Sequence, residues 1–324
     1  MYRPNYGIST KILGNISQIE YCRAVIETTP ILPHWEKQLQ KDARIRTLAS
    51  TLRFMQISIS NDEIKKYVDG LSDKTPLEAE NLDKALFYLQ QNAIHKELDE
   101  ELIKEIHAIV SEGITKPGIY RKRKIAGKTN PEEILAKMVE LIDWVNSLEA
   151  KETHPILVAG IVKSQLETIC PFEEANFASG NLISRLILLN GGFGFKGFNS
   201  PEDYYANTKQ EYDKQLYSYP AELTHWLEYF TDGLYREIAN IKEKVALLAR
   251  DIKVAKASGR IKLTDRQERI VEYLQDYGLL QNKDFTKVFP GVSEDSILRD
   301  LKTLISKEIV VKTGSTKSSR YELS

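Results

Sequence analysis

Residues 169–185 read ICPFEEANFASGNLISR and are the most informative stretch of the chain. An apolar helix would end just before Cys170 and Pro171, because proline cannot continue a helix. After the loop, a second apolar segment over residues 182–189 predicts another helix. The stretch therefore predicts two helices joined by a tight loop. The unpaired N–H groups at the start of the second helix could hold an anion.

Helical periodicity extends over most of the chain. Residues 102–109 and 135–145 carry apolar side chains at the i, i+3, i+4, i+7 spacing of amphipathic helices, with Leu135 and Val139 on the apolar face. We also expect Asn61-Asp62 to cap a helix, His154-Pro155 to form the first turn of another, and residues 234–254 to form a charged helix. The pattern predicts a mainly α protein with a helical N-terminal region (1–95), a helical core (96–235), a helical linker (236–261, including the connecting residues 256–260) and a distinct C-terminal region (262–324).

The C-terminal region combines helices with β-prone segments. Thr264 and Ser293 are suited to cap the first and third of three predicted helices. Two β-prone segments, residues 309–313 and 319–323, follow and are joined at Gly314-Ser315. Three helices and a small β-hairpin in this order are typical of a winged helix-turn-helix.

The bulk composition indicates a soluble globular protein. The 324 residues are 42% hydrophobic and 28% charged, and the net charge is −1. Two cysteines are too few for a disulfide framework, and no metal-type cysteine spacing occurs. The first residues lack the pattern of a signal peptide, and no apolar run approaches the ~20 residues of a membrane helix. We therefore expect a cytoplasmic protein without a membrane partner.

Residues 170–181 resemble the signature of the Fic family, H-P-F-x-(D/E)-G-N-G-R-x-G-R, which lies between two such helices. The ungapped alignment retains Pro171, Phe172, Glu174, Asn176 and Gly180. The resemblance implies a Fic-type helical core that transfers AMP from ATP to Ser, Thr or Tyr hydroxyls. It also implies that Glu174 holds a Mg²⁺ ion and that Asn176 and Gly180 lie at the phosphate and metal positions.

Most of the residues that carry out this chemistry are replaced. Cys170 stands where the family has its general-base His, and a thiolate is a poorer base than imidazole even where a helix N-terminus lowers the thiol pKa from about 8.5. The two signature glycines become Ala175 and Phe177, and we expect the Phe177 ring in the path of the phosphates. The two arginines become Ala178 and Asn181. Cys170 is therefore either a structural thiol or a reactive one.

Two further features bear on the same site. Arg185, one turn beyond the signature, could contact a phosphate from a shifted position. Residues 50–56 resemble the family's inhibitory stretch, (S/T)-x-x-x-E-(G/N), with Met55 at the position of the Glu. Since that Glu would pair with the Arg now replaced by Asn181, both partners of the inhibitory ion pair are absent.

Residues 117–121, PGIYR, resemble the family's P-G-x-Y-R entry to the flap that aligns a target segment by strand addition. The flap would extend over about residues 122–130. We expect the basic run 121–124 to be a solvated face of this loop.

The predicted third helix and hairpin of the C-terminal region carry the charges that bear on DNA binding. Glu294 and Asp295 open the helix and would oppose phosphate, whereas the wing is basic. The residues expected to contact DNA are Arg299, Lys302, Lys312, Lys317 and Arg320. A protein-contact or dimerisation module is the competing interpretation.

Three functions are consistent with the sequence. The first is a Fic-like pseudoenzyme that acts as a regulator through its winged helix, with DNA as the partner. The second is a divergent adenylyltransferase that still uses ATP and Mg²⁺. The third is a protein-interaction scaffold without a cofactor. The resemblance also implies that the protein can form homodimers.

Overall fold

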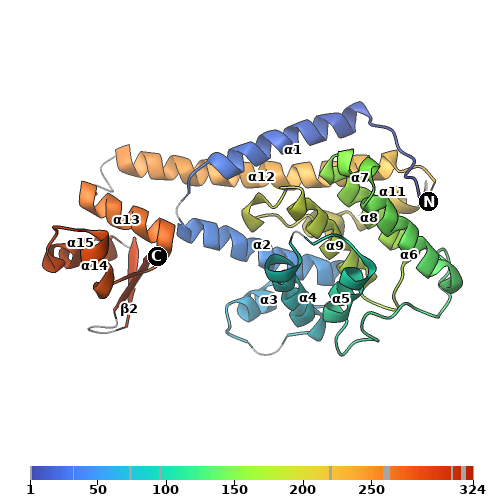
Figure 1. The fold of residues 1–324 in the computed structure, drawn as a ribbon, viewed down its shortest axis with the longest axis horizontal. Helices are drawn as coiled ribbons and strands as arrows, with labels where there is room; N and C mark the ends of the chain where they lie inside the picture. Colours follow the sequence, from blue (N-terminus) through green and yellow to red (C-terminus); the bar gives the residue numbers. More distant parts are fainter. Residues whose placement is uncertain are drawn as a thin grey trace. The chain divides into compact units, whose positions relative to one another are not determined.

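The computed structural model describes residues 2–31, 33–72, 75–94, 96–218, 221–257, 263–307, 309–314 and 319–323. The chain divides into two compact units: Met1–Thr28 with Gln40–Lys242, and Thr29–Leu39 with Glu243–Ser324. The predicted mainly α fold is confirmed (Figure 1). The four-part division from the sequence stays a prediction. Among the helices described, none is both long and apolar enough to cross a bilayer.

The first unit consists of helices. They are α1 (Thr10–Thr28), most of α2 (Pro33–Phe54), α3 (Asn61–Val68), α4 (Leu77–Tyr88) with the π-helical turn η1 (Leu89–Ala93), α5 (Glu100–Val110), α6 (Pro131–Val145), α7 (Leu148–Glu152), α8 (Pro155–Ile169), α9 (Asn176–Asn190), the 3₁₀ turn η2 (Phe195–Gly197), α10 (Glu202–Asn207), α11 (Lys209–Tyr217) and the first part of α12 (Thr224–Ala257).

The pair α8 and α9 forms the centre of the first unit. The two helices pack along each other, α4 and α5 pack on α9, and α6 packs on α8 (Figure 1). Helix α12 approaches α8 closely at Gly160, where a Cβ atom would lie 2.9 Å from Leu227, and Trp226 Nε1 donates a 2.8 Å hydrogen bond to the Gly160 carbonyl. The two helices that flank the signature loop are thus the most buried part of the unit.

The helix ends follow local chemistry. His154 caps α8 as predicted, accepting a hydrogen bond from the Ile156 N–H, with Pro155 at the first helical position. The cap of α3 is Ser60, which forms a capping box with Glu63, so the prediction of Asn61-Asp62 was one residue late. Helix α12 begins about ten residues before the predicted residue 234, because the apolar side chains of its first turns pack on α8.

Two apolar residues of α6 differ from expectation. Leu135 and Val139 are 54% and 43% exposed, although the periodicity placed them on the buried face. Met138 and Leu141 are buried instead. The apolar stripe is wider than the part of the helix that α8 covers, so the spacing alone did not identify the buried positions.

The second unit contains the predicted three helices and hairpin. The helices are α13 (Asp265–Tyr277), the short α14 (Phe285–Val288, after the 3₁₀ turn η3, Asn282–Asp284) and α15 (Glu294–Ser306). The strands β1 (Leu280–Gln281), β2 (Val310–Thr313) and β3 (Arg320–Leu323) form an antiparallel sheet in the order β1-β3-β2.

The caps and core of this unit agree with the sequence pattern. Thr264 forms a capping box with Gln267, and Ser293 caps α15. One apolar cluster joins the three helices to the sheet and includes Ile270, Phe285 and Leu301. Helix α12 extends to Ala257, beyond the predicted end of the charged helix at residue 254. The rest of the predicted linker and Ser315 lie outside the described residues.

Candidate functional site

The loop between α8 and α9 has an unusual backbone. Cys170 ends α8 at φ 49° and Ala175 precedes α9 at φ 58°, both in the left-handed region that favours glycine. Gln56, at the Gly/Asn position of the stretch that resembles the inhibitory motif, also has a positive φ of 63°. The backbone thus keeps conformations suited to glycine at positions where the residues have side chains.

Asn176 closes this loop from the first turn of α9. Its Oδ1 accepts a 2.9 Å hydrogen bond from the Phe172 N–H, and its Nδ2 donates to the Phe172 carbonyl at 2.8 Å. The side chain predicted to lie at a phosphate or metal position is therefore engaged with the backbone. Gly180, the other such residue, lies where α9 faces α8, and a Cβ there would meet Glu167 and Leu166 at ordinary contact distances.

The flap entry is bound to the loop through Arg121. Tyr120 pairs with Phe172 as an antiparallel bridge, and the Arg121 N–H donates to the Pro171 carbonyl at 2.9 Å. The Arg121 guanidinium, only 2% exposed, donates to four backbone carbonyls, those of Cys170 (2.7 Å), Arg123 (2.6 Å), Ile169 (3.3 Å) and Thr129. The expectation of a solvated basic run is therefore wrong at its first residue. The hydrogen bonds from the charged guanidinium to four carbonyls offset the free-energy cost of burying its charge.

His107 of α5 supports the loop from the other side. Its ring is buried and stacks on Phe172 with centroids 3.6 Å apart. The Gly118 N–H donates to Nδ1 at 3.0 Å, so Nε2 carries the proton and donates to the Glu174 carbonyl at 3.3 Å. Burial lowers the pKa of His107 from 6.5 to about 4, and the bond to Glu174 offsets only part of this effect. A neutral histidine thus joins the flap entry to the signature loop.

Cys170 lies in surroundings that keep its thiol protonated. Burial raises the pKa of Cys170, and this effect outweighs the nearby cations Lys128 and Arg121. The residue is the cap at the C-terminal end of α8, where the helix dipole disfavours a thiolate, and not at the N-terminus of α9. The pKa of the Cys170 thiol is therefore not lowered by a helix N-terminus.

Phe177 packs inside the unit. Its ring stacks on Phe54 with centroids 3.6 Å apart and planes within 3°, and only 8% of the residue is exposed. The buried ammonium of Lys163 lies 4.6 Å from the ring centroid and 2.5 Å from Asn181 Oδ1. Tyr205 and Tyr212 complete the aromatic surroundings of this ammonium.

Lys163 is a residue that the sequence reasoning missed. It is the one basic side chain in the apolar run 156–166. A single basic residue within an apolar helix is the signal that could have identified it. Glu167, four residues on, lies 3.5 Å away and balances its charge, while burial lowers the pKa of Lys163. Asn181, at the position of the second signature arginine, thus has a cation beside it, but aromatic rings enclose that cation.

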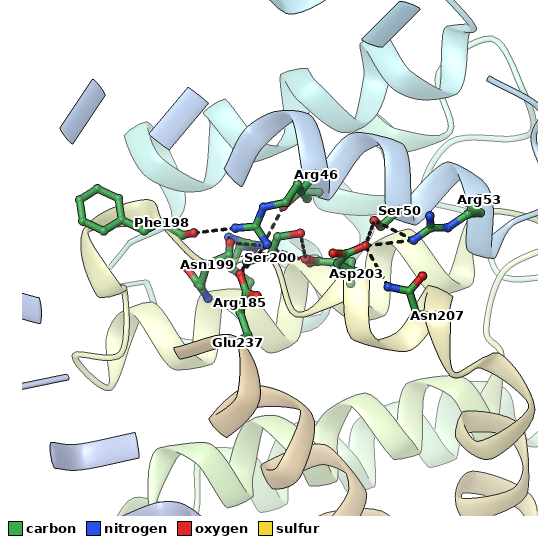
Figure 2. Close-up of polar contacts among 12 residues, drawn as sticks. Arg46, Ser50, Arg53, Arg185, Phe198, Asn199, Ser200, Asp203, Asn207 and Glu237 are labelled. Carbon is green, nitrogen blue, oxygen red and sulfur yellow. Dashed lines mark hydrogen bonds and ion pairs between the residues drawn. The ribbon is translucent and has the colours of Figure 1, made fainter. Parts of the chain in front are cut away.

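Arg185 belongs to a network that holds α2 against the start of α10 and the segment before it (Figure 2). Its guanidinium pairs with Glu202 at 3.1 Å and contacts the Asn199 carbonyl at 3.4 Å. In the same network Arg46 pairs with Glu237, and Asp203 accepts from Ser50 and Arg53 of α2 at 3.0 Å each. Arg185 is therefore committed to an ion pair in this structure, and its predicted contact with a phosphate stays a prediction.

A cavity of about 250 Å³ opens between the end of α2, the signature loop and helices α4 and α5. We call it the α2–α9 cavity. Its polar lining consists of Thr51, Glu78 and Glu174. Its apolar lining is Leu52, Met55, Ile57, Leu82, Val110, Ile114, Ala175 and Ala178.

The cavity brings together the two stretches that resemble family motifs. Thr51 and Met55 come from residues 50–56, whereas Glu174, Ala175 and Ala178 come from the signature. Cys170 is absent from its lining. Phe177 is absent as well, because its ring packs on Phe54, so the ring expected in the path of the phosphates leaves this cavity open.

The lining does not fit ATP with Mg²⁺. A triphosphate needs cationic partners, and among the residues that the structure describes, no Lys or Arg lines the α2–α9 cavity. The neighbouring Glu173 pairs with Arg123 at 3.2 Å. Within the described part of the chain, no group of three or more His, Cys, Asp or Glu side chains could hold a metal ion. Glu174 thus belongs to no such cluster in the described part of the chain.

Four of the five residues predicted to contact DNA lie on the surface of the second unit. Arg299 and Lys302 are exposed on α15, and Lys312 and Arg320 are exposed on β2 and β3. Lys312 and Arg320 flank the same hairpin, where Lys312 pairs with Tyr321 in register. Lys317 lies outside the described residues. The Asp300 carboxylate between the two helix positions is buried and pairs with Arg266, so it presents no negative charge on that face.

The relatives of the chain agree with the sequence resemblance. Residues 97–188 match the model of the Fic/DOC family. The chain is 30% identical over 159 residues to the protein adenylyltransferase Fic of Nematostella vectensis, which covers 46% of this chain and 37% of that protein. It is 22% identical over 188 residues to the protein adenylyltransferase fic-1 of Caenorhabditis briggsae, covering 56% and 31%. The chain thus spans about a third of the length of these curated relatives.

The fold has a solved counterpart over its full length. The crystal structure of a Fic family protein from Desulfovibrio desulfuricans superimposes with a TM-score of 0.66 and 18% identity, covering 100% of this chain and 98% of that one. At this identity the likeness concerns the fold alone.

Proposed function

From the premise that this chain is a Fic domain family protein, we propose that it is a pseudoenzyme that transfers no AMP and acts as a regulator. The observation that carries the proposal is the state of Cys170 at the general-base position. Its thiol is half-buried, and burial raises its pKa, so at neutral pH it cannot take a proton from a target hydroxyl.

The phosphate-binding side supports the same conclusion. Ala178 and Asn181 occupy the positions of the two signature arginines. Three nearby cations form other interactions. Arg121 binds carbonyls, Lys163 is enclosed by rings and Arg185 pairs with Glu202. Nothing among these groups is placed to neutralise a developing phosphate charge.

We expect no transfer when the purified protein is incubated with α-labelled ATP and Mg²⁺ or Mn²⁺. Loss of general-base catalysis alone costs a factor of about 10²–10⁴, so labelling of the protein itself or of lysate proteins should stay at background. An active Fic protein serves as the positive control. Labelling that the Glu174→Ala variant abolishes would establish a divergent adenylyltransferase instead.

The proposed output of the regulator is DNA binding by the second unit, whose element order is that of a winged helix-turn-helix. The exposed basic residues of α15 and the β2–β3 hairpin support this proposal, since phosphate neutralisation supplies most non-specific affinity.

A double variant, Arg299→Ala with Lys302→Ala, should weaken binding to duplex DNA and lower the slope of log K against log salt by about 2. Lys137→Ala, an exposed lysine of α6 in the first unit, is the matched control and should leave the slope unchanged. Recovery of a protein partner with no salt-dependent DNA binding would favour the scaffold interpretation.

A further inference from the structure

The α2–α9 cavity has the properties of a ligand site that differs from a nucleotide site. At about 250 Å³ it is somewhat smaller than the ~300–1,000 Å³ of drug-sized sites, and most of its lining is apolar. It lies within one compact unit, between α2, α4, α5 and the signature loop. Its size and walls suit a small molecule with an apolar body.

Thr51 supplies an unused polar group to this cavity. The residue is 1% exposed, and its Oγ1 has no hydrogen-bond partner within the described part of the chain. Other helical threonines bond the carbonyl four residues back, as Thr28, Thr168 and Thr231 do at 2.7–2.9 Å. A buried hydroxyl without a partner is costly, and a ligand atom in the cavity would satisfy it.

The charge of the lining identifies the ligand class. Glu78 and Glu174 contribute two carboxylates, and the described residues of the lining include no Lys, Arg or His. The N-terminus of α9 adds roughly half a positive charge at Ala175 and Ala178, which is less than the two carboxylates. The field in the cavity therefore favours a cation over an anion.

We propose that the α2–α9 cavity binds an organic ammonium compound, with its apolar body against the aliphatic walls, its charge near Glu174 or Glu78, and a hydrogen bond to Thr51. This inference rests on the proposed function only in that ATP is not the ligand. It assigns the cavity a sensing role in a protein that has lost transfer.

The test is calorimetric titration of the full chain with three compounds that share one body: 2-phenylethylamine, 2-phenylethanol and phenylacetate. We expect the amine to bind at least about tenfold more tightly than the carboxylate, with the alcohol between them. Equal or tighter binding of phenylacetate would overturn the proposal, as would the failure of all three to bind. ATP with Mg²⁺, titrated in parallel, should bind more weakly than the amine, and tighter binding of ATP would also overturn it.

Variants locate the binding in the cavity. The double variant Glu78→Gln with Glu174→Gln should remove most of the preference for the amine over the alcohol, and Thr51→Val should weaken the binding of both compounds. Ala178→Leu should abolish binding by filling the space. Glu101→Gln, an exposed carboxylate at the start of α5, is the matched control and should change nothing. Unchanged amine binding in Thr51→Val and in the double variant Glu78→Gln with Glu174→Gln would overturn the assignment even if Ala178→Leu fails to fold.

The result of the calorimetric titration can be distinguished from the result of the labelling experiment. Transfer of label, together with a clear amine preference and weaker binding of ATP than of the amine, would reject the pseudoenzyme and keep the cavity assignment. Background labelling with no amine preference would keep the pseudoenzyme and reject the cavity assignment.

Discussion

Replacing Arg121 by alanine should lower the free energy of unfolding by about 3–5 kcal/mol, the largest single effect expected in the signature region. The guanidinium donates to the carbonyls of Cys170, Arg123, Ile169 and Thr129, and two of these belong to the C-terminal end of α8. Alanine would leave these buried acceptors without donors and would remove the cation from the negative end of the helix dipole.

The measurement is urea unfolding of the first unit, followed by its tryptophan fluorescence. Arg123→Ala is the matched control, because Arg123 is 63% exposed in its side chain and forms only a surface pair with Glu173, worth about 1 kcal/mol or less. Arg121→Lys should recover little, since one ammonium cannot reach carbonyls arranged around a planar guanidinium. If Arg121→Ala lowers the free energy of unfolding no more than Arg123→Ala does, the stabilising role of the Arg121 guanidinium is contradicted.

The second large effect concerns pH. The pKa of His107 is about 4 in the folded protein and near 6.5 in the unfolded chain, so the unfolded state binds the proton first as pH falls. The contribution of His107 is therefore complete above pH 6.5 and is lost progressively between pH 6.5 and pH 4. The full loss is on the order of 3 kcal/mol. Protonation would also place a second hydrogen against the Gly118 N–H.

Carboxylates also lose stabilising interactions in acid, so the pH dependence of the wild type must be compared with that of a variant that lacks His107. Urea midpoints at pH 7, 6, 5 and 4.5 should fall more steeply for the wild type than for His107→Gln. The exposed His225→Gln variant of α12 should follow the wild type. Parallel profiles for wild type and His107→Gln would show that burial does not hold this ring neutral.

Much of the fold was predictable, because apolar spacing and caps are local signals. His154-Pro155, Thr264 and Ser293 begin helices as the sequence indicated, and α8 ends before Cys170-Pro171. The loop between α8 and α9 was predictable too, since its resemblance to a family signature is carried by residues in one short stretch.

The candidate site was less predictable, because its chemistry depends on residues far apart in the chain. The sequence showed what replaces each signature residue, but not that Phe177 turns onto Phe54 or that Arg185 pairs with Glu202. The burial of Arg121 depends on carbonyls that converge only after folding. The unpaired hydroxyl of Thr51 is equally invisible in sequence, since most helical threonines satisfy themselves.

The left-handed backbone at Cys170 and Ala175 bears on how this protein could be re-engineered. Each such residue costs about 1–2 kcal/mol relative to glycine, so the local sequence does not choose this path. Asn176, Arg121 and His107 impose it from outside the loop. The path of the chain and the chemistry carried on it are therefore separable properties, and new side chains could be introduced here without rebuilding the scaffold.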